Sequence, residues 1–584
     1  MGLPNVNLTV VDGNLGLQQG SNEQVVLLLG PCTSGISDTL YSFGNQTAMT
    51  NSLGLGKLVE AAGYAMQVGG GPVMCMPIEP NTAGALSTVT HTGTATGTLV
   101  IAAAPHAAVT ITCVTTGTIA GATAQFTFTV GSTVSSAITA TAGWSSTGYR
   151  IPGTYCTYVF VTGTYSASSD VYTISTAGVV AHSAGAGATA GTQSASPLDD
   201  YQALISITSS GTVASGTAQF TYSLDNGNTS LGGNGLTSSN IIVGSSGVYV
   251  IPNSGVYLTF AGQLDSGDTY KFKTVGPSCS SYTSALTALE TTYLAQATYA
   301  MVGVVQTNVS VTGWGTAAAV FETAATTLFN SGVYVRFMSE CPTVGTVFAS
   351  GSAVIVDSAD TDAVCIAQRA NVSAAHVLVG AGDCLLTSPV SGLTLRRNAM
   401  WVAAGRASSV EASQNLGFVG LGGVTGVVYI FRNETATPGM DAAGFTTLRQ
   451  INGVPGYYIT DAHTCSLATS DYYPFTNARV IDIACTVTRA NSLPLVNSKI
   501  PTTTRGSFVG VITEKKAQQI EAKIGGALII VMVDTQPQNA VAANAVVDRT
   551  HNIIADGNLI IAVAVQPFAY ARTVTVYIGL AVAA

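Results

Sequence analysis

Residues 557–584 read GNLIIAVAVQPFAYARTVTVYIGLAVAA and hold two β-rich runs, 559–565 and 573–580, separated by a break at Pro567. Valine, isoleucine, threonine and tyrosine dominate both runs and suit a pleated, partly buried surface. In the second run polar and apolar residues alternate, so one face of a strand there would be apolar. Because no later segment can cover this strand, we expect it either to fold back into its own sheet or to pair with another molecule.

The whole chain carries unusually little charge. Its 584 residues include 20 Lys+Arg and 29 Asp+Glu, which is 8% charged residues with a net charge of −9, against about 25% in an ordinary globular chain. Scattered basic residues argue against nucleic acid as a partner. The longest apolar runs fall far short of the roughly 20 residues that span a membrane, and the first residues fit neither a Sec-type signal nor a myristoylation site. We therefore expect a surface covered by Ser, Thr, Asn and Gly, or by other subunits.

Two kinds of pattern alternate along the chain. Apolar runs at 23–29 and 72–78, with a helical segment at 56–66, predict a strand–helix–strand unit with a parallel sheet. Residues 83–280 are instead rich in Thr, Ser, Gly, Ala and Val, and they contain a repeat: GTIAGATAQF at 117–126 matches GTVASGTAQF at 211–220. We expect two tandem β-sandwich domains in this region.

The α/β pattern resumes after residue 280. Helices are predicted at 282–295, 316–329, 393–407, 441–451, 477–492 and 513–524, and strands at 300–305, 333–338, 456–460, 527–533 and 559–565. The predicted fold class is a multidomain α/β (α+β) body with two inserted all-β, sandwich-like domains and extended N- and C-terminal strand arms. Its predicted parts are an N-terminal arm (1–20), a first part of the α/β core (21–82), two β-domains (83–192 and 193–280), a second part of the core (281–476), a C-terminal inner domain (477–568) and a C-terminal arm (569–584).

No motif predicts catalysis. The segment Gly54-Leu55-Gly56-Lys57-Leu58 lacks the earlier glycine and the Ser/Thr of a phosphate loop. Asp461 and His463 stand near Cys465 and suggest a Cys–His pair, but a local loop hydrogen bond is the favoured interpretation. The cysteines form no C-x-x-C and none has a histidine at zinc spacing. We predict no enzyme activity, no cofactor and no metal site.

Four segments in this order resemble a known family. They are PNVNLTVVDGNLG (4–16), GYYITDAHTCSLATSDYYPFTNARVIDIACTVTRAN (456–491), the charged segment 513–524 and LIIAVAVQPFAYARTVTVYIGLA (559–581). Together they resemble a contractile tail sheath protein of a myovirus-type bacteriophage. The resemblance covers residues 1–82 and about 281–584, and the order of the parts carries it.

The resemblance implies a structural subunit of the virion that is assembled in the host cytoplasm. Copies would polymerise helically around the inner tail tube by strand donation, meet the baseplate and tail terminator proteins, and contract to drive the tube through the host envelope. Implied strand arms contain Val6, Leu8, Val10, Val11 and Leu15, and Thr573, Val574, Val576, Ile578 and Leu580. The implied tube-facing residues are Lys515, Lys516, Glu521 and Lys523. Gly557 and Pro567 are candidate hinges, and residues 83–280 would either bind host surface glycans or only decorate the outside.

The ten cysteines fall into two groups. Five lie in apolar runs and are expected to be buried thiols, namely Cys75, Cys113, Cys156, Cys365 and Cys485. Five lie in turn-like sequence and are expected to be accessible, namely Cys32, Cys279, Cys341, Cys384 and Cys465. Because a phage particle is released into an oxidising medium, we predict that some of these five form disulfides, within or between subunits.

Two other classes of function stay open at this point. One is a passive extracellular adhesin or surface-layer protein that binds through the β-sandwich domains. The other is an enzyme, such as a glycan hydrolase with carbohydrate-binding β-domains, although carboxylates are scarce. Helical tubes of fixed diameter in electron micrographs would favour the sheath over both.

Overall fold

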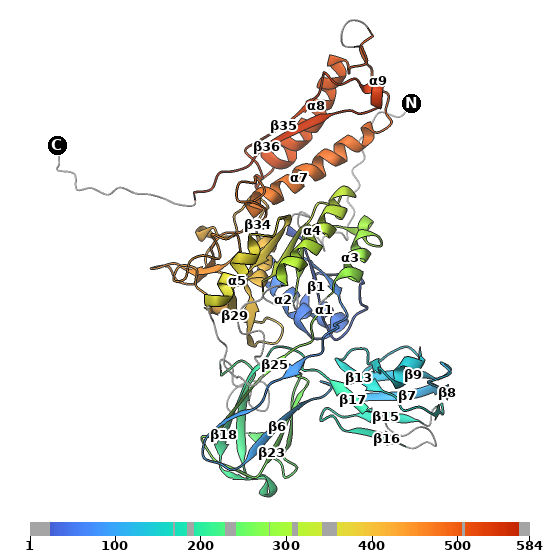
Figure 1. The fold of residues 1–584 in the computed structure, drawn as a ribbon, viewed down its shortest axis with the longest axis vertical. Helices are drawn as coiled ribbons and strands as arrows, with labels where there is room; N and C mark the ends of the chain where they lie inside the picture. The colour runs from blue at the N-terminus through green and yellow to red at the C-terminus, as the bar shows by residue number, and fades with distance from the viewer. Residues whose placement is uncertain are drawn as a thin grey trace, which may run out of the picture.

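The computed structural model describes residues 24–167, 170–183, 192–227, 241–279, 281–305, 313–341, 359–504 and 509–571. An α/β body lies in the middle, two β-sandwiches lie at one end, and a helical module that carries a two-stranded sheet lies at the other (Figure 1). The N-terminal arm and the C-terminal residues 573–584 lie outside the described residues, so the arm residues named above stay predictions.

The body is built on a seven-stranded sheet in the order β2-β3-β1-β26-β27-β28-β34. Its five inner strands are parallel, and the edge strands β2 and β34 run antiparallel to their neighbours. The strands are β1 Val26–Gly30, β2 Tyr41–Phe43, β3 Val73–Pro77, β26 Met301–Val304, β27 Arg336–Glu340, β28 Ala374–Gly380 and β34 Thr464–Cys465. The strands predicted at 23–29, 72–78, 300–305 and 333–338 are confirmed here.

Helices cover both faces of this sheet. Alternate residues of β1 separate accordingly: Val26 and Leu28 pack with α1, α2 and α6, whereas Leu27 and Leu29 pack with α3, α4 and α5. This double burial explains why the strand reads as a continuous apolar run. The helices are α1 Gln46–Leu53, α2 Lys57–Gly69, α3 Thr283–Glu290, α4 Trp314–Asn330, α5 Ala359–Arg369 and α6 Ala399–Ser409. A small sheet of β29 Asp383–Thr387, β30 Thr394–Asn398 and β31 Val427–Ile430 and a hairpin of β32 Leu448–Gln450 and β33 Tyr457–Ile459 complete the body.

The two β-sandwiches are inserted between β3 and α3. Thr82 and Ser278 form an antiparallel bridge, so the chain leaves the body and returns to it at the same point. The first sandwich contains β7 Val109–Thr115, β8 Gly117–Thr118, β9 Gln125–Val130, β10 Thr133–Val134, β11 Ile138–Thr139, β12 Tyr149–Arg150, β13 Cys156–Val159, β14 Thr164–Tyr165, β15 Val171–Ile174, β16 Val180–Ser183 and β17 Thr192–Ala195. The second contains β4 Ala85–Leu86, β5 Thr90–Thr92, β6 Thr98–Ala103, β18 Gln202–Ser209, β19 Gly211–Thr212, β20 Gln219–Ser223, β21 Ile241–Ile242, β22 Val248–Ile251, β23 Val256–Ala261, β24 Gln263–Leu264 and β25 Thr269–Val275.

The first sandwich is nested inside the second. Strands β5 and β6 precede the first sandwich in sequence, yet they pair with β25 and β23 of the second. They occupy the places that β16 and β17 take in the first sandwich, where these pair with β15 and β13. The match extends to side chains, because the Tyr172 and His182 rings stack at 4.4 Å and the Tyr270 and His91 rings at 4.5 Å. The second sandwich is therefore completed by β5 and β6, which precede the first sandwich in sequence. The equivalent strands of the first sandwich, β16 and β17, are its last two.

The C-terminal module packs two long helices against a two-stranded sheet. Its elements are α7 Phe475–Ser492, α8 Glu514–Leu528, a π-helical turn Ile529–Asp534, β35 Ala542–Val547, α9 Ile553–Asp556 and β36 Ile561–Gln566. The predicted helices 477–492 and 513–524 and the strand 559–565 are confirmed. A core of its own, which includes Ile520, Ile524, Leu528 and Met532, joins α8 to the sheet.

Three element predictions are wrong in part or whole. The helix predicted at 393–407 begins only at Ala399, because residues 394–398 pair as β30 with β29 and the Asn398 side chain then caps the helix. The helix predicted at 441–451 is a series of turns leading into β32. The strand predicted at 527–533 continues α8 and its π-helical turn, because Leu528 and Met532 are buried in the module core. In each case tertiary packing overrides local propensity.

The prediction of accessible cysteines and disulfides is also wrong. All five turn-region cysteines are buried, with Cys32 5% exposed and the other four 0%. Even the Sγ atoms of Cys341 and Cys365, which are in hydrogen-bond contact, lie 3.2 Å apart, against about 2.05 Å in a disulfide. Burial raises the pKa of Cys32 and of Cys279 to about 12. The turns that carry these thiols are covered by other parts of the fold, which local sequence does not reveal.

Candidate strand-docking site

The most distinctive surface of the C-terminal module is the sheet formed by β35 and β36. Its strands run antiparallel, with Ala543 opposite Val565 and Ala545 opposite Val563. Ala543, Ala545 and Val547 are buried, whereas the alternate residues of β35 are exposed, so one face packs on the helices. Within the described residues no third strand pairs with either outer edge. An unpaired strand edge is a template for another strand.

A groove runs along α7 beside β36. One side is formed by Ile561, Val563 and Val565, and the remaining lining residues are Tyr334, Tyr472, Ile481, Ala484, Cys485, Thr488, Arg489, Ser492, Leu493 and Val496. The groove has a volume of about 570 Å³. A continuation of about 320 Å³ toward the body is lined by Tyr472, Asn477 and Pro567. The groove is therefore largely apolar and lies beside β36.

The length of the groove suits a single β-strand. The α7 residues that line the groove and its continuation run from Asn477 to Ser492, which at about 1.5 Å per residue is roughly 22 Å of helix. A strand rises about 3.4 Å per residue, so about seven residues would fill it. Strand β36 itself has 6 residues.

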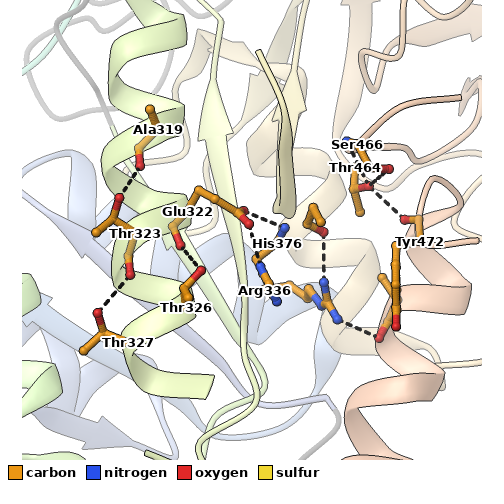
Figure 2. A network of polar contacts seen from close by, with 12 residues as sticks. Ala319, Glu322, Thr323, Thr326, Thr327, Arg336, His376, Thr464, Ser466 and Tyr472 are labelled. Atoms are coloured by element: carbon orange, nitrogen blue, oxygen red, sulfur yellow. Dashed lines mark hydrogen bonds and ion pairs between the residues drawn. The ribbon is translucent and has the colours of Figure 1, made fainter. Parts of the chain in front are cut away.

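A buried ion pair fixes α7 to the body. Arg336, at the start of β27, is 2% exposed, and its Nε donates to Asp482 Oδ2 of α7 at 2.6 Å. Its Nη1 and Nη2 donate to the carbonyl oxygens of Ala375 and Ala478 at 2.9 and 3.2 Å (Figure 2). Since this guanidinium contacts both β28 and α7, it joins the body to the module.

A second arginine joins α7 to the end of α6. Arg479 Nη2 donates to the carbonyl oxygens of Ala407 and Val410, each at 3.2 Å, and its Nη1 donates to that of Glu411 at 3.3 Å. A cation at the C-terminus of a helix is favoured by the unpaired carbonyl groups there. Arg479 and Asp482 lie one turn apart, so the first half of α7 is held on the body, and the side of α7 that lines the groove continues from Ile481 to Ser492.

The predicted tube-facing residues do not share one environment. Glu521 accepts hydrogen bonds from Arg549 and from the Val547 amide at 2.8 Å, so it points toward β35. The bond from Arg549 is the main cause that lowers the pKa of Glu521. Lys515 and Lys523 are exposed and Lys516 is half-buried. The role of these four residues toward a tube stays a prediction.

The other sequence candidates lie apart from this groove. Lys57 begins α2 and forms an ion pair with Asp200 of the second sandwich. His463 is stacked on Tyr473 at 4.4 Å, with Nε2 3.4 Å from Asp441 Oδ1, while the neighbouring Cys465 is fully buried. No group of three or more His, Cys, Asp or Glu in the described part of the chain has the arrangement of a metal site. Nor does any helix in those ranges have the length and apolarity to cross a membrane.

Sequence reasoning missed the groove and the two arginines that hold α7. The apolar residues Ile481, Ala484 and Cys485 recur at helical spacing, but this pattern is equally typical of a helix that faces a closed core. Arg336 stands in an otherwise apolar run, VYVRFM at 333–338. An arginine in a strand with both faces covered requires a polar partner. The position of Arg336 in such a strand could therefore have indicated that it forms a buried ion pair.

Comparisons with solved structures find the following similar proteins. The sheath tail protein of Desulfitobacterium hafniense matches over 96% of this chain and 100% of that chain, with 9% identity and a TM-score of 0.37. The sheath tail protein of Listeria innocua matches over 93% and 94%, with 11% identity and a TM-score of 0.38. A chain of the anti-feeding prophage baseplate matches over 53% and 76%, with 12% identity and a TM-score of 0.34.

The sequence also matches a described family. The description is "DUF2586, N-terminal domain", and the match extends over residues 3–463. A search of curated proteins finds no match. Since the matched residues make up most of the 584, this chain belongs to the DUF2586 family.

Proposed function

We propose that this chain is the structural subunit of a contractile tail sheath, in a phage or in a phage-like contractile device. Copies polymerise helically around an inner tube by donating strand arms to one another, and the polymer shortens to drive the tube through the host envelope. The role is mechanical rather than enzymatic, and the tube, baseplate and terminator proteins are its partners. One observation carries the proposal: β35 and β36 form a rigidly mounted sheet whose outer edges have no strand partner in the described chain.

The occupant proposed for the groove beside β36 is the run 573–580 of a second copy. Val574, Val576 and Ile578 alternate with polar residues, so they could fill the apolar groove while the other residues face solvent. The run is eight residues long, close to the length of the groove. The same chain is poorly placed to donate it, because Tyr570 is hydrogen-bonded to Ser413 near the end of α6. The N-terminal arm would take the remaining edge.

Strand donation would make a strong joint from weak contacts. Each main-chain hydrogen bond contributes about 0.5–1.5 kcal/mol net, and each aliphatic side chain that becomes buried contributes about 1.5–3 kcal/mol. Ordering the arm opposes these gains. Because such a contact is heterologous and need not close on itself, repetition gives a helical filament.

Electron microscopy of the purified full-length chain tests this function. We expect helical tubes of fixed diameter, and we expect deletion of residues 573–584 to leave a folded subunit that does not polymerise. Val563→Asp should block polymerisation because Val563 lines the groove. Ala564→Asp is the matched control, since Ala564 is exposed on the same strand. Polymerisation of the deletion variant, or equal effects of the two substitutions, would contradict strand donation into this groove.

The sandwiches are better explained as fixed outer structure than as glycan-binding domains. Arg397 of the body reaches Asp199 at 2.6 Å, and Arg150 of the first sandwich pairs with Glu79. In the described parts of the sandwiches the exposed large apolar residues are all aliphatic, namely Val100, Val114, Val134, Val179, Ile242 and Val248. Tyr149, Tyr249 and Tyr257 are half-buried, so none of the tyrosines described there offers a fully open ring on which a sugar could stack. Unchanged adsorption to host cells after deletion of the sandwiches would support this interpretation, and reduced adsorption would favour glycan binding.

A further inference from the structure

The chain returns to the body directly after β36. Pro567 lines the lower end of the groove, and three residues later the Tyr570 hydroxyl donates a hydrogen bond to the carbonyl oxygen of Ser413, in the segment that follows α6. Ser413 is tied to the module as well, because its Oγ donates to the carbonyl oxygen of Gln538 at 2.9 Å. Tyr570 is thus held where the body and the C-terminal module meet.

The acceptor side of this contact is firmly built. Ser413 is 7% exposed, and it lies two residues after Glu411, whose carbonyl oxygen accepts a hydrogen bond from Arg479. On the donor side Ala569 and Ala571 are exposed, whereas Phe568 and the Tyr570 ring are half-buried. Loss of the hydroxyl would therefore weaken the hold on this end of the chain without disturbing the acceptor.

We propose that Tyr570 is a positioning residue that latches the root of the C-terminal arm and sets how much chain can reach a neighbouring copy. This inference rests on the proposed function. With the latch closed, the segment available for donation begins at Ala571. With the latch open, it begins at Pro567, and four more residues add about 13 Å of reach at about 3.3 Å per residue. The same arm could then serve two subunit spacings without leaving its acceptor sheet.

This assignment moves the hinge predicted from the sequence. Gly557 and Pro567 are the candidate hinges that the sequence predicts near this end, but in the structure the residues after Pro567 are still held by Tyr570. In the latched chain the hinge lies after Tyr570, and Pro567 becomes the hinge only when the latch opens.

Limited trypsin digestion of the unassembled full-length chain tests the latch, because Arg572 is two residues beyond it. Tyr570→Phe removes the hydroxyl and keeps the ring. We expect release of the 573–584 fragment, followed by mass spectrometry, to become about fivefold faster, since one hydrogen bond is worth about that factor in an equilibrium. Tyr429→Phe, at a half-exposed tyrosine of β31, is the control and should leave the rate unchanged. Equal rates for Tyr570→Phe and the natural chain would overturn the latch.

A second measurement asks whether reach is the property that the latch controls. Inserting Gly-Ser-Gly-Ser after Ala571 keeps the latch but lengthens the arm by the same four residues. In electron micrographs of the polymers, the insertion and Tyr570→Phe should shift subunit spacing in the same direction, and a shift in only one of them would overturn the reach argument. Failure of every chain to polymerise would overturn the proposed function, and the digestion rates would still decide whether Tyr570 holds the arm.

Discussion

Breaking the contact between Arg336 and Asp482 should loosen the C-terminal module from the body. Arg336→Met keeps an unbranched side chain of similar length but removes the charge and all donors. It leaves the Asp482 carboxylate, 7% exposed, without the guanidinium that donates to both of its oxygens. It also leaves the Ala375 and Ala478 carbonyl groups without this donor.

The expected cost follows from these contacts. Removing one partner of a buried ion pair costs about 3–5 kcal/mol, because the remaining charge stays buried and uncompensated. The double variant Arg336→Met/Asp482→Leu removes both charges and should recover most of this loss, since well-packed apolar side chains often replace a buried pair at little cost. The natural chain and the two variants therefore form an ordered series.

Native-state hydrogen exchange measures how strongly α7 is held on the body. A chain with several cores is not expected to unfold in one step, so a single melting temperature would mix them. Exchange of the α7 amides reports the local opening free energy instead. A loss below about 1 kcal/mol in the single variant would refute the claim that this pair holds the module. Arg549→Met is the control, because Arg549 pairs with Glu514 and Glu521 on the surface, where water screens the charges and such pairs contribute little.

Three further predictions concern other parts of the molecule. In the unassembled native chain a thiol reagent should modify one cysteine, Cys485, which lines the groove and is the only one of the ten that is not buried. Polymerisation should protect Cys485 from the reagent. Ready labelling of a second cysteine would contradict the burial pattern. Burial raises the pKa of Glu60, so in the folded state this carboxyl keeps its proton at pH values where a free one is ionised. The stability of the body around α2 should therefore fall as pH rises through the raised pKa. Glu60→Gln should remove this fall in the opening free energies that hydrogen exchange of the α2 amides reports between pH 4 and 8. Replacing residues 105–197 by a short linker should leave the second sandwich folded, as measured by circular dichroism and proteolysis. The two ends to be joined lie close together, because the amides of Ala104 and Leu198 donate to the carbonyl groups of the adjacent residues Gly255 and Ser254. Aggregation of this variant would show that the sandwiches depend on each other.

The body was predictable from the sequence because its signals are local. A strand with both faces covered, such as 26–30, reads as an apolar run whatever its neighbours are. The nesting of the sandwiches was not predictable from the repeat, because β6 pairs with β23, more than 150 residues later, and the pairing partner of a short Thr- and Ala-rich strand leaves no local trace. The same limit applied to 527–533, where Ile529, Ile530 and Val531 favour a strand but the burial of Leu528 and Met532 keeps the chain helical.

The cysteines illustrate the limit at single residues. The sequence GPCTSG predicts a turn at Cys32, and Cys32 does lie in a loop. This loop, however, lies between the body and the first sandwich. Arg150 of that sandwich donates to the Cys32 carbonyl oxygen at 3.4 Å, and the thiol is enclosed. Turn-like sequence predicts backbone geometry well, but exposure depends on what else the fold places over the turn.

The strengths of these contacts decide where the proposed polymer would yield. If copies change their spacing, the movement must occur within the module, between the module and the body, or along the donated arm. Arg336 and Arg479 both resist movement between α7 and the body, and loss of either partner of the buried pair costs about 3–5 kcal/mol. Tyr570 holds the arm root through one side-chain hydrogen bond, worth about 1 kcal/mol. The arm root therefore yields first, so each subunit should keep its shape while the chain between subunits takes up the change in distance.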